Sequence, residues 1–227
     1  MNNMEKNLNE IHTRIASAAD ASGRAADSIM LLAVSKKKPA SDIRLAYACG
    51  QRDFGENYLQ EALQKMQELQ NLDINWHFIG AIQSNKTRSI AEAFAWVHCV
   101  DRLKIAKRLS EQRPSTLAPL NVCIQVNIDH EASKAGIALD ELNDLAAAIA
   151  ELPGIRLRGL MAIPAPRADY HGQCQAFARL AEALAALRQQ GLDCDTLSMG
   201  MTQDMDAAIT QGSTIVRIGT AIFGERP

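Results

Sequence analysis

The chain has 227 residues, of which 47% are hydrophobic and only 4% aromatic, so Ala, Leu, Ile and Val must fill most of any core. Its 24 basic and 26 acidic side chains leave a net charge of −2, which argues against an extended nucleic-acid interface because such interfaces need a basic excess. Five cysteines without C-x-x-C spacing indicate reduced thiols and argue against a disulfide framework or a metal site.

The N-terminal segment MNNMEKNLNEIHTRIASAAD lacks the apolar centre of a signal peptide, and no later stretch is long enough to cross a bilayer. We therefore expect a cytoplasmic protein without membrane contact. Within residues 4–21, Leu8, Ile11, Ile15 and Ala18 recur at helical spacing. This pattern predicts that the first element is an amphipathic helix.

After this helix, short runs rich in Val, Ile, Leu and Met alternate with longer stretches rich in Ala and Leu. The short runs predict strands at 28–35, 52–54, 75–79, 96–100, 120–128, 155–163, 195–199 and 214–218. The longer stretches predict helices at 40–49, 57–70, 84–94, 102–112, 139–151, 169–190 and 203–210.

Strands that alternate with helices pair in parallel through right-handed crossovers, and eight such units favour closure into a barrel. No linker of low complexity divides the chain. We therefore predict an α/β fold, with residues 1–227 forming a single (β/α)8 TIM-type barrel domain. The eighth strand ends at residue 218, which leaves no room for an eighth helix, so the N-terminal helix is expected to cover that flank.

Functional residues of such barrels lie at the carboxyl ends of the strands. The first strand runs into AVSKKKPA, and strand alternation puts Leu32, Val34 and Lys36 on one face. If that face points inward, Lys36 lies at the barrel mouth, where desolvation and the adjacent cations Lys37 and Lys38 would lower the pKa of its amine. A deprotonated lysine forms an imine with an aldehyde. A solvated basic loop without special reactivity is the alternative interpretation.

The ends of strands two and three give weaker signals. After strand two, Gly55 and Glu56 are expected to form a turn, with Asn57 at the start of a helix, where Asn is a common N-cap. In strand three, His77 is interpreted as a core residue, and Gly80 follows it.

Three further strands end in small or apolar residues. Strand six ends with Met161 and Ala162 at the mouth, followed by two prolines, Pro164 and Pro166. Strands seven and eight lead into loops that often bind phosphate in such barrels, because small residues let backbone N–H groups approach an anion. The candidates in these two loops are Ser198, Gly200, Gly219 and Thr220. Ordinary turn chemistry is the alternative for these residues.

An imine-forming lysine combined with a phosphate site suggests an aldehyde phosphate, and pyridoxal 5′-phosphate (PLP) is the first candidate. Schiff-base aldolases of phosphosugars satisfy the same two requirements. Arg217 in the eighth strand helps to choose between these two possibilities. A guanidinium beside the pyridine nitrogen would discourage ring protonation and weaken the cofactor as an electron sink.

Nearly the whole chain carries six ordered motifs: AVSKKKP, FGENYLQEA, WHFIGAIQSNK, GLMAIPAP, LSMGMTQDMDAAI and VRIGTAIFG. Together these motifs resemble the pyridoxal-phosphate homeostasis proteins, the YggS/PROSC-like family. The resemblance implies the barrel of alanine racemase without its C-terminal β domain, a fold-type III PLP protein. It also implies a protein that holds PLP as a lysine Schiff base, without significant turnover, and takes part in intracellular vitamin B6 and amino-acid homeostasis.

Carried over to this sequence, the resemblance assigns the imine to Lys36 and a place near the pyridine nitrogen to Arg217. It places Ser198, Gly200, Gly219 and Thr220 around the phosphate, and Asn57, Ile79, Gly80 and Met161 around the pocket. Two departures from relatives are Ala81-Ile82, which could loosen the loop after strand three, and the short tail GERP. Lys134 is a weak candidate for a second aldehyde-reactive amine.

A PLP-dependent amino-acid racemase is the main alternative function. Racemisation needs a second acid–base group opposite the lysine, which is a tyrosine of the missing domain in the racemases. Tyr47, Tyr58 and Tyr170 have no obvious position of this kind, and Tyr58 is expected one residue inside a helix. An isomerase would need an inward carboxylate, for which Glu56 is the nearest candidate. We expect a monomer whose partners are PLP and, by extension, apo forms of PLP-dependent enzymes.

Overall fold

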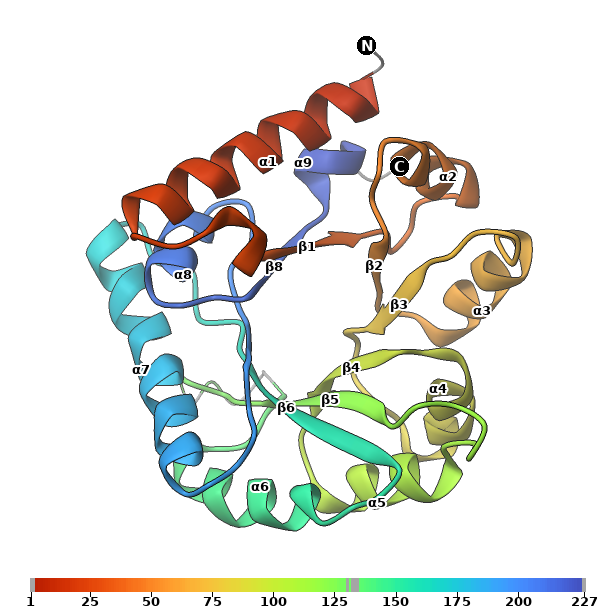
Figure 1. Ribbon diagram of the computed structural model, residues 1–227, viewed down its shortest axis with the longest axis vertical. Coiled ribbons are helices and arrows are strands. Elements are labelled where there is room, and N and C mark those ends of the chain that lie inside the picture. Colours follow the sequence, from red (N-terminus) through yellow and green to blue (C-terminus); the bar gives the residue numbers. More distant parts are fainter. Residues whose placement is uncertain (1–2, 130, 132–134, 226–227) are drawn as a thin grey trace.

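Eight parallel strands close into a barrel in the computed structural model, which describes residues 3–129, 131 and 135–225. The strands follow one another around the barrel in sequence order, and the last pairs with the first (Figure 1). They are β1 (Met30–Val34), β2 (Asp53–Glu56), β3 (Asn75–Phe78), β4 (Trp96–Val100), β5 (Leu120–Gln125), β6 (Ile155–Met161), β7 (Thr196–Ser198) and β8 (Ile215–Ile218). The predicted (β/α)8 barrel is therefore confirmed.

Helices surround the barrel, and all but the last lie close to the positions that the hydrophobic periodicity predicts. They are α1 (Asn3–Ala21), α2 (Ala40–Ala48), α3 (Leu59–Glu68), α4 (Thr87–Ala93), α5 (Leu103–Gln112), α6 (Leu142–Ala150), α7 (Tyr170–Gln189), α8 (Met205–Thr210) and α9 (Thr220–Phe223). Short 3-10 helices span Ala26–Ser28, Ser84–Lys86 and Leu139–Glu141. Among the residues described, no helix is both long enough and apolar enough to span a bilayer.

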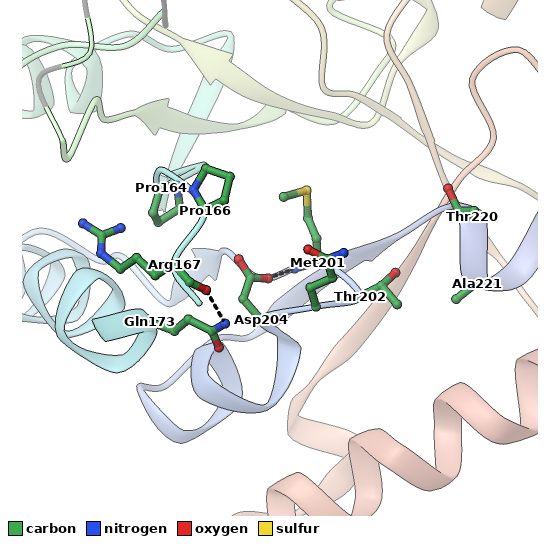
Figure 2. Close-up of a pocket in the computed structure, with 10 residues that line it drawn as sticks. Pro164, Pro166, Arg167, Gln173, Met201, Thr202, Asp204, Thr220 and Ala221 are labelled. Carbon is green, nitrogen blue, oxygen red and sulfur yellow. Dashed lines mark hydrogen bonds between the residues drawn. The ribbon is translucent and has the colours of Figure 1, made fainter. Parts of the chain in front are cut away.

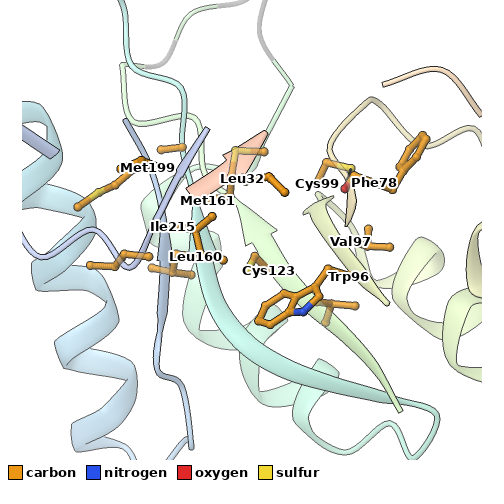
Figure 3. Close-up of a cluster of buried hydrophobic side chains, with 14 of the residues drawn as sticks. Leu32, Phe78, Trp96, Val97, Cys99, Cys123, Leu160, Met161, Met199 and Ile215 are labelled. Carbon is orange, nitrogen blue, oxygen red and sulfur yellow. Dashed lines mark hydrogen bonds between the residues drawn. The ribbon is translucent and has the colours of Figure 1, made fainter. Parts of the chain in front are cut away.

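The strands are apolar on both faces because one face lines the barrel and the other packs against the helices. All five residues of β4 are buried. Figure 3 shows part of this core, to which Leu32 of β1, Trp96 of β4, Cys123 of β5 and Met161 of β6 contribute. The core holds few aromatic rings, as the composition requires, and aliphatic side chains fill it.

Helix α1 covers the flank of the barrel next to β8, as predicted. Its apolar positions Leu8, Ile11 and Ile15 are buried, and in Figure 1 the helix lies beside α8 and α9. Arg14 fixes this arrangement: its Nε donates to the Asp206 carboxylate at 2.9 Å, and its Nη1 donates to the Thr202 carbonyl at 2.6 Å. The N-terminal helix thus closes the molecule where β8 is followed by only a short helix.

Three expectations for chain ends and turns were wrong. A helix does follow β8, because the four residues of α9 fit in the space beside α1. Gly55 and Glu56 belong to β2 instead of forming a turn, since Gly55 pairs with Val34 of β1 and Glu56 pairs with Phe78 of β3. Tyr58 precedes α3 in an extended conformation and is exposed. Pairing on both sides of β2 thus outweighs the local turn preference of glycine.

Candidate functional site

The three adjacent lysines after β1 have three different environments. Ser35 accepts a hydrogen bond from the backbone N–H of Lys38 at 3.0 Å, so Lys36 and Lys37 are the central residues of a turn. Lys36 is half-buried, Lys37 is exposed, and Lys38 is buried with its Nζ donating to the Glu225 carbonyl at 2.5 Å. A uniformly solvated loop does not describe this segment, because only Lys37 extends fully into water.

Arg217 lies inside the barrel on the strand next to β1, where it pairs in register with Leu32. Its Nη1 donates to the Ser198 carbonyl at 2.6 Å and to the Ser198 hydroxyl at 2.8 Å, and its Nη2 donates to the Ala162 carbonyl at 3.0 Å. Burial lowers the pKa of the guanidinium to about 10, which still leaves it charged at neutral pH. A fixed cation therefore lies between the ends of β6, β7 and β8.

Ser198 has its side chain engaged inside the barrel. It was expected among the phosphate-binding groups, but it is fully buried, and its hydroxyl contacts Arg217 and the Nδ1 of His98, the latter at 2.8 Å. Its hydroxyl is therefore engaged in holding the arginine.

A hydrogen-bonded chain continues from Ser198 across the barrel. His98 Nε2 lies 2.9 Å from His77 Nδ1, and His77 Nε2 lies 3.2 Å from the Asp53 carboxylate. A carboxylate only accepts hydrogen bonds, so the direction of the chain follows from its end at Asp53. We assign His77 as donor to Asp53, His98 as donor to His77, and the Ser198 hydroxyl as donor to His98.

Burial favours the neutral form of both histidines. Burial lowers the pKa of His77, although Asp53 partly opposes the shift. The pKa of His98 is well below its usual value, first because of burial and then because of the nearby His77 and Arg217. The interpretation of His77 as a satisfied core residue is thus confirmed. Neither Asp53 nor His98 was singled out from the sequence. Strand alternation puts His98 on the same face of its strand as Trp96, and this signal could have identified it.

Glycines in the loops after β7 and β8 lie close to neighbouring segments of the barrel and its helices. Gly200 has φ +94, and a Cβ there would lie 2.5 Å from the Cβ of Ala208. Gly219 immediately precedes α9, and a Cβ there would lie 3.2 Å from the Val34 carbonyl oxygen. The carbonyl of Gly200 accepts the backbone N–H of Arg217 at 3.0 Å, which ties the two loops together.

A cavity of about 510 Å³ opens beside these loops (Figure 2). Its walls come from the loops after β6 and β7 and from the start of α9. Pro164, Pro166, Met201, Asp204 and Thr220 are among the lining residues. The two prolines of the loop after β6 thus form one side of an open space next to the candidate phosphate loops.

Asn57 and Gly80 bring the loops after β2 and β3 together. A Cβ on Gly80 would lie only 2.1 Å from the Asn57 carbonyl oxygen, so this contact requires glycine. The Asn57 side-chain oxygen is buried and has no hydrogen-bond partner among the residues described. Both residues line a second cavity of about 400 Å³. Ile79 packs close to Gly55, and Met161 ends β6 almost fully buried.

Of the remaining candidates, the structure places Glu56 and Ile82 but does not describe Lys134. Glu56 is buried on the outer face of β2, bonded to Lys65 of α3 at 2.7 Å, so it is not an inward carboxylate. Ile82 is buried, and its carbonyl accepts from Arg102 at 3.2 Å, which anchors the loop that contains Ala81-Ile82. Lys134 and the last two residues of the tail lie outside the residues that the structure describes.

The residues present fit a phosphorylated pyridine aldehyde. Lys36 supplies the amine, Arg217 supplies a buried cation, and the glycine-lined loops provide space for an anion. Asn57 offers a buried acceptor without a partner among the described residues.

Comparison with known proteins identifies the family of the chain. The family model for the alanine racemase N-terminal domain matches residues 4–227. The pyridoxal phosphate homeostasis protein of Pseudomonas aeruginosa strain PAO1 is 60% identical over 226 residues, which is 100% of this chain and 97% of that protein. Its counterpart in Escherichia coli K12 is 55% identical over 229 residues, which covers 100% of this chain and 98% of that protein.

Two solved structures extend the comparison. PipY of Synechococcus elongatus PCC7942, solved with PLP bound, is 38% identical with a TM-score of 0.82, covering 92% of this chain and all of that chain. Alanine racemase of Corynebacterium glutamicum is 21% identical with a TM-score of 0.68, covering 97% of this chain and 62% of that one, which shows a shared fold. The chain belongs to the pyridoxal phosphate homeostasis protein family, whose barrel is that of the alanine racemase N-terminal domain.

Proposed function

We propose that this protein binds PLP covalently through Lys36 and takes part in PLP and amino-acid homeostasis without significant catalytic turnover. The observation that carries the proposal is that Lys36, Gly219 and Thr220 line the same narrow cavity, between the turn after β1 and the start of α9. An amine that can bond to an aldehyde therefore lies beside the backbone that can bind its phosphate. The PLP-bound structure of PipY and the high identity to homeostasis proteins support the same assignment.

When bound, the cofactor would supply an aldehyde that joins the Lys36 amine in a C=N bond with loss of water. Gly200, Gly219 and Thr220 would hold the phosphate through their backbone, and Asn57, Ile79, Gly80 and Met161 would line the pocket. Ser198 would contribute through Arg217, because its hydroxyl accepts the guanidinium N–H at 2.8 Å.

Arg217 favours a binding protein over an enzyme. Its guanidinium is charged at neutral pH, since burial lowers its pKa only to about 10. Beside a pyridine nitrogen, this charge discourages ring protonation and so limits electron withdrawal from a bound substrate. The buried hydrogen-bonded chain from Ser198 to Asp53 keeps Arg217 in place. The group of this chain that contacts the guanidinium is the Ser198 hydroxyl, which is too weak a base to remove its proton.

An amino-acid racemase is the second candidate, and the tyrosines argue against it. Tyr47 lies on α2 with the Arg52 guanidinium 3.8 Å from its ring centre, and Tyr170 lies at the start of α7 with its hydroxyl 2.9 Å from Thr210. Both are on the outer helices. Tyr58 is nearer the mouth, but its side chain is 50% exposed. Efficient two-base racemisation needs a base held opposite the lysine, and none of these three tyrosines is so held.

The central experiment is reduction of the PLP complex with borohydride followed by peptide mapping. We expect the purified protein to be yellow, the label to map to Lys36, and Lys36→Ala to lose covalent attachment. Lys107→Ala is a matched control, because Lys107 is exposed on the outer helix α5, away from the proposed site. A wild-type protein that takes up no PLP, or a label that stays at full yield in Lys36→Ala, would refute the proposal.

Incubation of the PLP-loaded protein with L-alanine and other amino acids separates the two functions. We expect no significant loss of optical rotation, and substantial turnover would favour the racemase. As partners we propose PLP and apo forms of PLP-dependent enzymes, with the protein acting as a cytoplasmic monomer. Transfer of bound PLP to an apo-enzyme faster than its release into solution would support direct delivery.

A further inference from the structure

A buried charged cluster lies behind the turn that carries Lys36, on the outer face of the barrel. This outer cluster consists of Ser35, Glu56 of β2, and Glu61 and Lys65 of α3. Lys65 Nζ donates to Glu56 at 2.7 Å and to Glu61 at 2.5 Å. The side chains of Lys65 and Glu56 are almost completely buried, and only Glu61 reaches water.

The cluster fixes the residue before Lys36. Lys65 Nζ donates to the Ser35 carbonyl at 2.9 Å, and the Ser35 hydroxyl donates to Glu56 at 2.6 Å. The backbone N–H of Ser35 donates to the Gly55 carbonyl at 3.0 Å. Every polar group of Ser35 is therefore held, either by β2 or by the lysine of α3.

The cluster also fixes the residue after Lys36. The backbone N–H of Lys37 donates to Glu61 Oε1 at 2.6 Å. Lys37 has φ +61, and among the described residues no other non-glycine residue has positive φ. A left-handed conformation is unfavourable for a lysine and persists only where the surroundings impose it. The Glu61 carboxylate supplies such a constraint at the residue that bears the strain.

We propose that Glu61 and Lys65 are positioning residues for Lys36, which they hold from outside the barrel by fixing both of its neighbours. The inference rests on the proposed function, in which Lys36 is the attachment point for PLP. The two side chains act on the backbone of the turn and orient the amine toward the loops after β7 and β8.

The composition of the cluster favours a positioning role over a purely stabilising one. The Glu56 carboxylate and the Lys65 ammonium are buried together beside the partly exposed Glu61, although an apolar cluster of the same size stabilises a fold at least as well. Charged groups form shorter and stronger hydrogen bonds to backbone N–H and C=O groups than neutral ones do. The cluster uses one such bond on each side of Lys36.

The first test compares three variants of partly exposed glutamates, measured by PLP titration and by thermal unfolding. Glu61→Ala removes the acceptor for Lys37 N–H, whereas Glu61→Gln keeps an oxygen in its place. Glu92→Ala is the matched control, because Glu92 forms an i,i+4 pair with Arg88 on the surface of α4. We expect Glu61→Ala to weaken PLP binding roughly three- to tenfold. Glu61→Gln and Glu92→Ala should stay near the wild-type affinity.

The second test asks whether the lost affinity comes from the strained turn. In the Glu61→Ala background, Lys37→Gly should recover most of the affinity, because glycine adopts positive φ without steric strain. Lys37→Ala removes the same exposed charge but keeps the strain, so it should recover none. A purely structural role of Glu61 would lower the unfolding temperature without this difference between glycine and alanine.

The outcomes separate this inference from the proposed function. If wild-type protein carries PLP on Lys36 and Glu61→Ala binds it equally tightly, the positioning role is wrong and the proposed function stands. If wild-type protein carries no PLP on Lys36, the proposed function is wrong, and the positioning role that rests on it is wrong as well. Lys65→Met provides a further check in folded protein, where its PLP affinity should fall at least as far as that of Glu61→Ala. Unchanged affinity in Lys65→Met would also overturn the inference.

Discussion

Individual polar residues inside the barrel act as one connected group. Asp53, His77, His98 and Ser198 pass hydrogen bonds across four strands until they reach Arg217. Buried polar groups are tolerated when their partners are satisfied, and here each partner comes from a different strand. The position of Arg217, and with it the charge at the barrel mouth, depends on residues as distant as Asp53.

The buried histidines predict a stability that declines on the acidic side of neutrality. Burial lowers the pKa of His77 and His98 in the folded protein, whereas an unfolded histidine titrates near its usual value of about 6.5. The unfolded chain therefore binds more protons as the pH falls below about 6.5. The free energy of unfolding should drop by up to about 1.4 kcal/mol per pH unit for each histidine.

Urea unfolding at a series of pH values measures this slope. His98→Gln, which can still donate and accept hydrogen bonds, should reduce the slope below pH 6.5. His171→Gln is the control, because His171 is exposed on α7 and should leave the slope unchanged. An identical slope in His98→Gln and wild-type protein would contradict the assignment of a neutral buried His98.

Gly80→Ala tests the close contact between the loops after β2 and β3. The new Cβ would overlap the Asn57 carbonyl oxygen at 2.1 Å, so the two loops must separate. We expect a loss of about 1–3 kcal/mol in the free energy of unfolding and weaker PLP binding. At Gly172, the nearest atoms to a new Cβ belong to side chains of Asp169 and Arg167, so Gly172→Ala should be mild by comparison. Equal effects of both substitutions would show that the contact is unimportant.

At the scale of elements, α1 and α3 attach to the barrel for different reasons. Helix α1 buries an apolar stripe against the flank formed by α8 and α9, and its ion pair with Asp206 is partly exposed. Helix α3 also carries Lys65, whose charged end reaches the turn after β1. One helix therefore contributes mainly to stability, and the other also contributes to the geometry of the site.

Ile15→Ala tests the contribution of α1. The Ile15 side chain is 3% exposed, so its truncation removes buried apolar surface and leaves a cavity. We expect the free energy of unfolding to fall by about 2–4 kcal/mol. Ser17→Ala on the exposed face of the same helix should change it by less than about 0.5 kcal/mol. Denaturant unfolding measures both, and similar values would mean that α1 is not firmly docked.

At the scale of the whole molecule, closure of the barrel leaves no free strand edge among the eight strands, so its interior opens only when the sheet breaks. Cys99 of β4 and Cys123 of β5 report on this property, and Cys194 reports on the segment that leads into β7. Cys99, Cys123 and Cys194 are buried, and burial raises the pKa of each thiol, that of Cys194 to about 11. Cys49 and Cys174 are partly exposed.

Alkylation followed by mass spectrometry should therefore give two classes of thiol. In native buffer, rapid labelling should be confined to Cys49 and Cys174, because thiolate formation and access both limit the reaction. The three buried thiols should become reactive together, over the same urea range in which the far-UV signal is lost. Fast labelling of Cys123 in native buffer would show that the barrel opens locally.

Much of this architecture could be read from the amino-acid sequence. The strand predicted at 96–100 matches β4 residue for residue, and the helix predicted at 102–112 differs from α5 by a single residue. Strand alternation from Leu32 and Val34 led to Lys36, and the order of strands led to the loops that contain Gly200 and Gly219. These features are local, because hydrophobic periodicity and turn residues report directly on the segment that contains them.

Tertiary structure decided the rest. The extension of β2 through Glu56, the engagement of Ser198 with Arg217, and the chain from His98 to Asp53 all join residues that are far apart in sequence. The same holds for the contacts of Lys65 and Glu61 with the turn around Lys36. Barrel closure sets the register between neighbouring strands, and this register selects which side chains meet. No periodicity within one segment contains that information, so sequence determined the elements and their order, whereas the closed barrel determined the polar contacts of the site.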